Sequence, residues 1–286
     1  MKYKIGPVTI EIQNLHSNQL VNRLVTFCIS EKKYDLLYNV SYYENIHMPL
    51  KKHIVYENEQ IIVAKKGSIK QYYHIFQGVP YALVEEISMK NYNIILLNDI
   101  VKIQKVHPYF FLELLHLERV MVNWSNLVLH SSYINVNNGA ILFTAPSGGG
   151  KSTQAELWKK YKNAEIINGD KSIIGKEDGQ WNVYGIPFSG SSEYCLNKTF
   201  PLKAIVILDK GPVNEFKRID IKGFSNVFSQ VTVNPWDREF CEKAMDLVMD
   251  VCNEVPIYYY SCTKTQEAVE VLYREFVEKG VLNGAV

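Results

Sequence analysis

The chain has few cysteines, and no pattern brings them together. Its five cysteines are scattered and odd in number, and no Cys-x-x-Cys pair occurs. This arrangement argues against a disulfide framework and against a structural zinc site. It favours a reducing compartment.

Long hydrophobic runs and an excess of charge are also missing. No apolar stretch approaches the length of a membrane span, and the first six residues lack the apolar centre of a signal peptide. A formal net charge of +1 over 286 residues gives no electrostatic reason to expect nucleic acid or an acidic membrane surface. We therefore expect a soluble, cytoplasmic protein that binds neither nucleic acid nor membranes.

The length and the 47% hydrophobic content suit one large domain or two ordinary ones. Residues 1–104 contain short runs that alternate apolar and polar residues, separated by turn residues, which predicts a β-rich domain with an antiparallel sheet. Its candidate role is acceptor recognition. Apolar residues then recur at steps of three and four, which predicts an amphipathic helix over about 108–126, introduced by His107-Pro108 and serving as a linker over 105–126. Residues 127–286 form the second domain.

One stretch of the second domain carries recognisable chemistry. Residues 145–153 read Ala-Pro-Ser-Gly-Gly-Gly-Lys-Ser-Thr, which fits the phosphate-loop (Walker A) pattern with Ala in first place. A strand-like run, 140–144, precedes it, and good helix formers, 154–160, follow it. The glycines let the backbone wrap a polyphosphate, and the N–H groups of the loop and of the helix N-terminus face the anion.

This loop is expected to bind ATP or another nucleoside triphosphate. Lys151 would reach the β- and γ-phosphates, and the hydroxyl of Ser152 would hold Mg²⁺. The predicted nucleotide-binding residues are Ser147, Gly148, Gly149, Gly150, Lys151, Ser152 and Thr153.

A histidine is predicted to lie close to the loop. The run 127–136 has strand character, and Asn137-Asn138-Gly139 is a strong hairpin turn that leads into the strand before the loop. Counting back from the turn places His130 near the phosphate end of the loop. We therefore treat His130 as a candidate catalytic residue.

An acidic residue follows the next strand. Residues 164–168 form a short apolar strand that ends at Gly169-Asp170-Lys171. A carboxylate at the end of a strand beside a phosphate loop is suited to binding Mg²⁺ or to accepting the proton of an acceptor hydroxyl. Asp170 is accordingly a candidate metal ligand, with Ser152, and a candidate catalytic residue, with Lys151.

Together these residues resemble the HPr kinase/phosphorylase-like family of P-loop kinases, a family related to phosphoenolpyruvate carboxykinase that includes kinases of lasso-peptide type. The resemblance covers roughly residues 127–275. It rests on the Leu129-His130-Ser131 strand, the Pro146-to-Ser152 loop and the Asn168-to-Lys171 motif, with the Gly-Ile-Pro-Phe-Ser-Gly segment at 185–190 similar to the lasso-type relatives.

The resemblance implies a fold of the α+β or α/β class, in which a mixed sheet flanked by helices follows the β-rich domain. It also implies transfer of the γ-phosphoryl group of ATP to a serine of a peptide or protein, such as a ribosomally made peptide. It also implies a homo-oligomer and a position for His130 near the γ-phosphate. Two positions depart from the family. HPr kinases have two adjacent aspartates where this chain has Gly169-Asp170, and they have Glu at the position of Thr153, which moves the match away from HPr as the substrate.

Several alternatives stay open on these residues. The base is Asp170 alone, His130, or Glu193, the one carboxylate of the flexible segment 185–193. A protein that binds nucleotide without transferring phosphate, acting as a regulator or scaffold in peptide maturation, is the alternative function. Carboxykinase chemistry on a small metabolite is disfavoured because the sequence shows no evident cluster of basic residues for its carboxylates.

Overall fold

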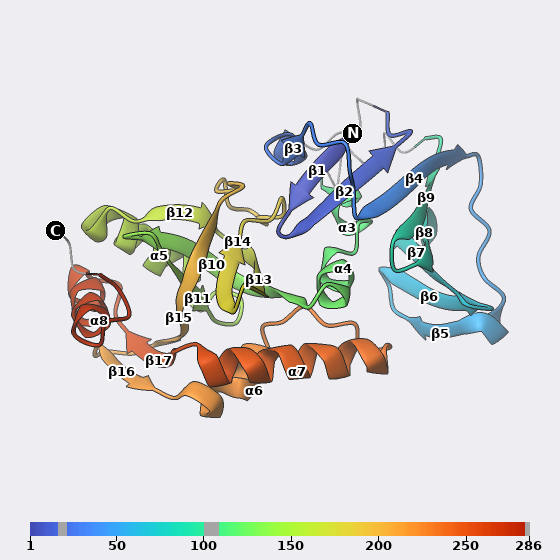
Figure 1. Cartoon of the computed structure of the whole chain (residues 1–286). Helices are drawn as coiled ribbons and strands as arrows, with labels where there is room; N and C mark the ends of the chain where they lie inside the picture. The colour runs from blue at the N-terminus through green and yellow to red at the C-terminus, as the bar shows by residue number, and fades with distance from the viewer. Residues whose placement is uncertain (17–21, 100–108, 284–286) are drawn as a thin grey trace. The chain divides into compact units, whose positions relative to one another are not determined.

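The computed structural model describes residues 1–16, 22–99 and 109–283, and the chain divides into two compact units between Val120 and Met121 (Figure 1). The division falls inside the segment 105–126 that was expected to link two domains. The expected punctuation at His107-Pro108 lies outside the described residues.

The described part of the first unit is built around one nine-stranded sheet with the strand order β3-β1-β2-β4-β9-β8-β7-β6-β5. Its elements are β1 (Lys2–Ile5), β2 (Val8–Gln13), α1 (Asn22–Val25), β3 (Cys28–Ile29), β4 (Leu36–Tyr43), η2 (Lys51–His53), β5 (Ile54–Glu57), β6 (Ile61–Lys66), β7 (Ile69–Phe76), β8 (Val79–Ser88), β9 (Asn91–Leu97) and α3 (Phe110–Glu113).

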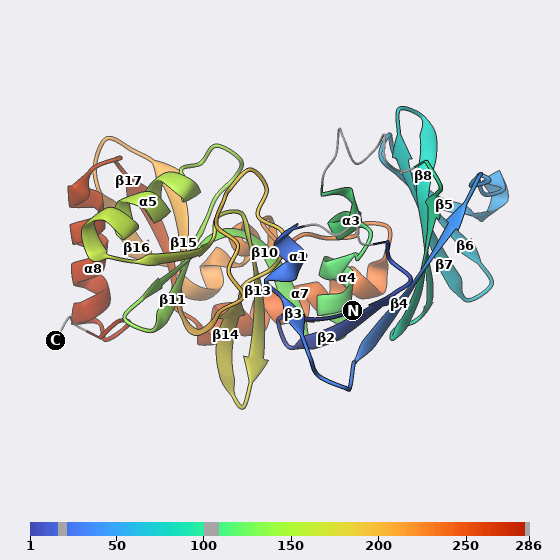
Figure 2. The ribbon, with the colours of Figure 1, turned by 90° about the horizontal axis from the view of Figure 1, so that it is seen from above.

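The β-rich character expected for this region is present, but the expected antiparallel sheet is wrong. The sheet is mixed, because β4 pairs in parallel with both β2 and β9. Alternation of apolar and polar residues reports which face of a strand is buried and does not report the direction of its neighbours. Figure 2 shows β4 running across this unit beside β2.

The continuous helix expected over 108–126 is also wrong. The described residues form two short helices, α3 and α4 (Leu117–Asn123). His116 lies between them with a backbone φ of 43°, in the left-handed region that interrupts a helix. Its buried ring makes a 3.1 Å contact between its Nε2 and the Nε2 of His74 on β7, so a tertiary contact stabilises the break.

The second unit has alternating strands and helices. Its elements are β10 (Asn126–Val136), β11 (Gly139–Thr144), α5 (Lys151–Lys162), β12 (Glu165–Asn168), β13 (Lys171–Glu177), β14 (Gln180–Tyr184), β15 (Thr199–Lys210), β16 (Glu215–Arg218), η3 (Asp220–Gly223), α6 (Phe224–Phe228), α7 (Arg238–Glu254), β17 (Ile257–Cys262) and α8 (Gln266–Glu278). Its eight described strands form a mixed sheet, ordered β11-β10-β13-β14-β15-β17-β16, with β12 paired to β10.

Two long strands connect the parts of this sheet. β10 pairs with β13 through its first half and with β11 through its second half. β15 pairs with β14 at its start and runs parallel to β11 and β17 further along. The parallel strands β11, β15 and β17 therefore end at one edge of the sheet, where ligands of α/β proteins bind.

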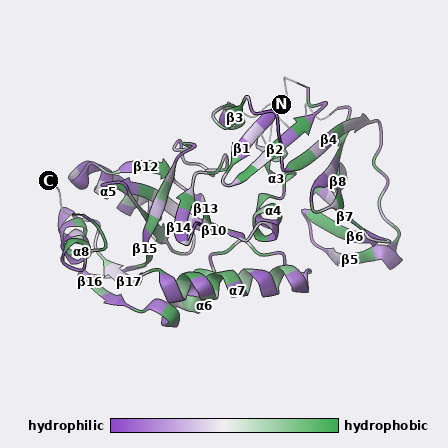
Figure 3. Cartoon of the chain, in the orientation of Figure 1, coloured by the Kyte–Doolittle hydropathy of each residue, from purple (hydrophilic) through white to green (hydrophobic). Residues whose placement is uncertain are grey.

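Helices cover both faces of these parallel strands. Ala204 and Val206 of β15 pack in a core with Trp158 of α5 and Phe276 of α8. The intervening Ile205 packs in a second core with residues of α7. Hydrophobic and hydrophilic residues alternate along α7 (Figure 3), as expected for a helix with one buried side. This agrees with the expected α/β class, a mixed sheet flanked by helices.

Candidate functional site

The glycine-rich loop between β11 and α5 has the geometry of an anion cradle. Gly148 and Gly150 have positive φ angles, 74° and 102°, and α5 begins at Lys151. A Cβ on Gly149 would lie 2.5 Å from the Cβ of Ala145 and 2.9 Å from the carbonyl oxygen of Pro146, so this position excludes any side chain. The backbone therefore requires glycine here for conformation and for space.

The first residue of α5 directs its amine back into the loop. The Lys151 side chain is buried, and its Nζ donates a 2.9 Å hydrogen bond to the carbonyl oxygen of Ala145. Burial lowers the pKa of Lys151, and the nearby Asp170 carboxylate opposes that change. The neighbouring Ser152 is exposed, so its hydroxyl faces solvent at the same helix end.

The hairpin delivers His130 to the loop, as predicted from Asn137-Asn138-Gly139. Both asparagines have positive φ angles, 48° and 61°, which a type I′ turn requires. In the resulting register Ser131 pairs with Thr144, the last residue of β11. His130 therefore lies level with the start of the loop, and Thr144 Oγ1 donates a 2.9 Å hydrogen bond to its carbonyl oxygen.

The side chains of His130 and Asp170 are in contact beside the loop. His130 Nε2 lies 3.2 Å from Asp170 Oδ1, and both side chains are partly exposed. The hydrogen bond from His130 lowers the pKa of Asp170, against the opposing effect of burial, and Lys171 and Lys151 lower it further. The carboxylate is therefore ionised at neutral pH.

Asn168 determines where Asp170 lies. Its Oδ1 accepts hydrogen bonds of 3.0 Å from the backbone N–H groups of Asp170 and Lys171. Its Nδ2 donates to the carbonyl oxygens of Ile186, at 2.9 Å, and Phe188, at 3.1 Å. The fully buried amide thus ties the Asp170 turn to the segment 185–196, which follows β14.

The position where the resemblance implies a catalytic aspartate is closed in this chain. A Cβ on Gly169 would lie 2.0 Å from Oγ and 2.4 Å from Cβ of Ser192. Gly169 is therefore not a vacant position beside the site, because Ser192 occupies the space of its missing side chain. Asp170 is the one acidic residue of this motif.

Two adjoining cavities meet at Asp170. The first, which we call the loop cavity, has a volume of about 350 Å³. It is lined by His130, Ser147, Gly148, Gly149, Gly150, Lys151, Ser152, Thr153, Gly169, Asp170, Ser191, Lys210 and Lys264. All the predicted nucleotide-binding residues and all three predicted catalytic residues therefore line one cavity.

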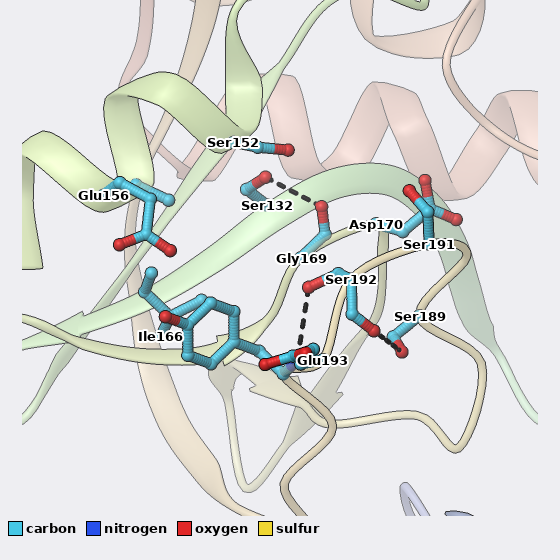
Figure 4. Close-up of a pocket in the computed structure, with 12 residues that line it drawn as sticks. Ser132, Ser152, Glu156, Ile166, Gly169, Asp170, Ser189, Ser191, Ser192 and Glu193 are labelled. Atoms are coloured by element: carbon cyan, nitrogen blue, oxygen red, sulfur yellow. Dashed lines mark hydrogen bonds between the residues drawn. The ribbon is translucent and has the colours of Figure 1, made fainter.

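The second, which we call the serine cavity, has a volume of about 390 Å³ (Figure 4). It is lined by Ser132, Ser152, Ala155, Glu156, Ile166, Gly169, Asp170, Ser189, Ser191, Ser192, Glu193 and Tyr194. Glu193, the third candidate base, belongs to this cavity and is absent from the lining of the loop cavity. Figure 4 shows Glu193 and Ser152 on opposite sides of it.

The loop cavity contains two basic residues that sequence reasoning missed. Lys210 is the last residue of β15, and Lys264 follows β17 by two residues. Together with Lys151 they form the basic cluster that the sequence did not reveal. The available signal was their place at or just after the end of an apolar run, since the carboxyl ends of parallel strands meet at one edge.

No protein-family model and no curated protein sequence matches the chain. Among solved structures, the chain is similar to the HPr(Ser) kinase/phosphatase from Coxiella burnetii, with 14% sequence identity and a TM-score of 0.33. That match covers 54% of this chain and 97% of the other. A TM-score this low supports no inference about activity.

Proposed function

We propose that the protein is a kinase that transfers the γ-phosphoryl group of ATP, or of another nucleoside triphosphate, to the serine hydroxyl of a peptide or protein. One observation carries the proposal. The glycine-rich loop, Lys151 and the His130–Asp170 pair, which are separated in sequence, line the same cavity. Phosphoryl transfer depends mainly on positioning and charge neutralisation, and these groups can supply both.

The residues of the loop cavity fit a magnesium-bound triphosphate. The cradle at Gly149 has no room for a side chain, and the amine of Lys151 and the hydroxyl of Ser152 stand at the same helix end. Within the described ranges, no group of three or more His, Cys, Asp or Glu residues could hold a metal ion. Mg²⁺ needs no such group when phosphates and one or two protein oxygens share its coordination.

Ser152 and Asp170 would hold the ion, and bound Mg²⁺ would neutralise charge on the phosphates. Lys151, Lys210 and Lys264 would add positive charge around them. Within the described residues of the two linings, Asp170 is the one carboxylate common to both cavities, so we assign the acceptor's proton to it. A lowered pKa makes Asp170 a weak base, but a loose transition state asks for little proton abstraction. His130 is a positioning residue in this scheme, because it donates a hydrogen bond to Asp170.

The test is a Lys151→Ala variant assayed with γ-labelled ATP and the proteins encoded beside this gene as acceptors. We expect transfer to fall by at least about 10²-fold, the usual loss when one group that stabilises transition-state charge is removed. Lys160→Ala, on the exposed side of the same helix, is the matched control and should retain activity. Circular dichroism and thermal melting check that both variants fold.

Undiminished transfer by Lys151→Ala would exclude this assignment. The alternative, a regulator or scaffold that binds nucleotide without transferring phosphate, predicts a different result. In that case calorimetry shows ATP binding by the natural protein, while no acceptor gains label. One observation favours this alternative. Because Gly169 has no room for a side chain, Asp170 would have to bind Mg²⁺ and also accept the proton of the acceptor.

A further inference from the structure

The serine cavity contains five serine side chains, and they differ in their hydrogen bonds. Ser132 Oγ donates to the carbonyl oxygen of Gly169, and Ser189 Oγ donates to the carbonyl oxygen of Ser192. Ser192 Oγ accepts from the backbone N–H of Tyr194. Within the described lining, this leaves Ser152 and Ser191 as the serines whose hydroxyls have no hydrogen-bond partner.

Ser152 has an assigned task as a magnesium ligand, but Ser191 has none. Ser191 is exposed and lines both the loop cavity and the serine cavity. It therefore stands at the wall that the two cavities share with Asp170. A free hydroxyl beside a phosphate loop and a carboxylate has the requirements of a phosphoryl acceptor.

The backbone before Ser191 keeps it beside Asp170. Gly190 has a φ of 53°, and a Cβ on it would lie 3.0 Å from Cγ and 3.1 Å from Oδ2 of Asp170. The positive φ favours glycine at this position, and the chain passes close to the Asp170 carboxylate. Figure 4 draws Ser191 next to Asp170, at a distance from Glu193. The next turn is also ordered, because Ser192 N donates a 2.9 Å hydrogen bond to the Ser189 carbonyl oxygen.

We propose that Ser191 is a phosphoryl acceptor within its own chain. The inference rests on the proposed function and adds a specific modification site to it. Ser191 Oγ forms the new bond to the γ-phosphorus of the nucleotide as the bond from that phosphorus to the β–γ bridging oxygen breaks. The Ser191 proton passes to the Asp170 carboxylate, and the products are phosphoserine at this position and the nucleoside diphosphate.

The experiment uses the full chain without any added acceptor. The protein is first treated with a phosphatase, which is then removed, and is incubated with Mg²⁺ and γ-labelled ATP. Intact-mass and peptide mass spectrometry then locate the label. We expect one phosphoryl group per chain, located on Ser191. Ser191→Ala should lose the label, Ser191→Thr should carry it as phosphothreonine, and Ser192→Ala, which changes the neighbouring hydroxyl, should keep it on Ser191.

A mixing experiment tests transfer within the chain. Tagged Lys151→Ala protein is added to the natural protein, and the label on each is measured at several dilutions. We expect the tagged variant to stay unlabelled and the rate per chain to be independent of concentration. Label on the tagged variant would overturn transfer within the chain.

The possible failures are distinguishable. A protein that phosphorylates an added acceptor or hydrolyses ATP, yet carries no label on Ser191, overturns this inference and leaves the proposed kinase function standing. A protein that binds no nucleotide by calorimetry overturns both. Equal labelling of Ser191→Ala and the natural protein overturns the choice of residue.

Discussion

The loop cavity and the serine cavity share Ser152, Gly169, Asp170 and Ser191, but their linings carry opposite charge. The loop cavity adds Lys151, Lys210 and Lys264 to a backbone of N–H donors. The serine cavity adds Glu156 and Glu193, and its described lining includes no lysine or arginine. A polyphosphate is attracted to one side and repelled from the other. Under the proposed function, this asymmetry would keep the phosphates of a nucleotide in the loop cavity, with Asp170 at its boundary with the serine cavity.

The first prediction tests whether phosphoryl transfer depends on the carboxylate that lines both cavities, Asp170, or on one that lines the serine cavity alone, Glu193. Asp170→Asn keeps the shape of the side chain and removes the charge that would bind Mg²⁺ and accept the proton, so we expect kcat for transfer to fall by at least about 10²-fold, the usual loss when one charge-stabilising group is removed. Glu193→Gln, in the serine cavity alone, should change kcat by less than about tenfold. Steady-state kinetics with γ-labelled ATP measures both. A larger loss in Glu193→Gln than in Asp170→Asn would reassign the base.

The second prediction concerns the closed position at the shared wall. Gly169→Ala forces a Cβ against Ser192, so we expect the free energy of unfolding to fall by about 1–3 kcal/mol. The double variant Gly169→Ala/Ser192→Gly removes the clash and should recover part of that loss, which gives a coupling energy in a double-mutant cycle. Urea unfolding of the four proteins measures it. If the changes in unfolding free energy of the two single variants simply add in the double variant, the contact between position 169 and Ser192 does not limit the residue at position 169.

The third prediction compares the charges of the two cavities directly. Lys210 and Lys264 are exposed, so Lys210→Ala and Lys264→Ala should each raise KM for ATP several-fold. The effect should weaken as salt is added, because exposed charges are screened. Glu156→Gln, in the serine cavity, should leave KM for ATP unchanged or slightly lowered. If the lysine and glutamate variants change KM for ATP equally, the charge difference between the two cavities does not determine where ATP binds.

Much of the site could be predicted because its signals are local in the sequence. The loop needs glycine at consecutive positions, the hairpin needs asparagines with positive φ, and Asp170 directly follows its strand. Each of these places a residue relative to its neighbours along the chain. Together they were sufficient to bring His130, Lys151 and Asp170 to one cavity.

The parts that were missed depend on contacts between distant residues. Lys210 and Lys264 reach the cavity only because β15 and β17 run parallel to β11 and to each other. The closure of Gly169 depends on Ser192, twenty-three residues later in the chain. In the first unit the break at His116 depends on His74, and the parallel pairing of β4 leaves no mark in its own residues.

Among the helices of the described residues, none combines the length and the apolar character that crossing a membrane would need.

Asn168 makes hydrogen bonds with both ends of its amide, and its four partners belong to two different stretches of chain. The turn that bears Asp170 and the segment that leads to Ser191 are therefore joined through one buried side chain. Ile186 and Pro187 are themselves buried, so the Asp170 turn is anchored to the interior of the protein as well as to its own strand. A change at Asn168 would therefore release the position of the Asp170 carboxylate relative to Ser191 without altering either residue.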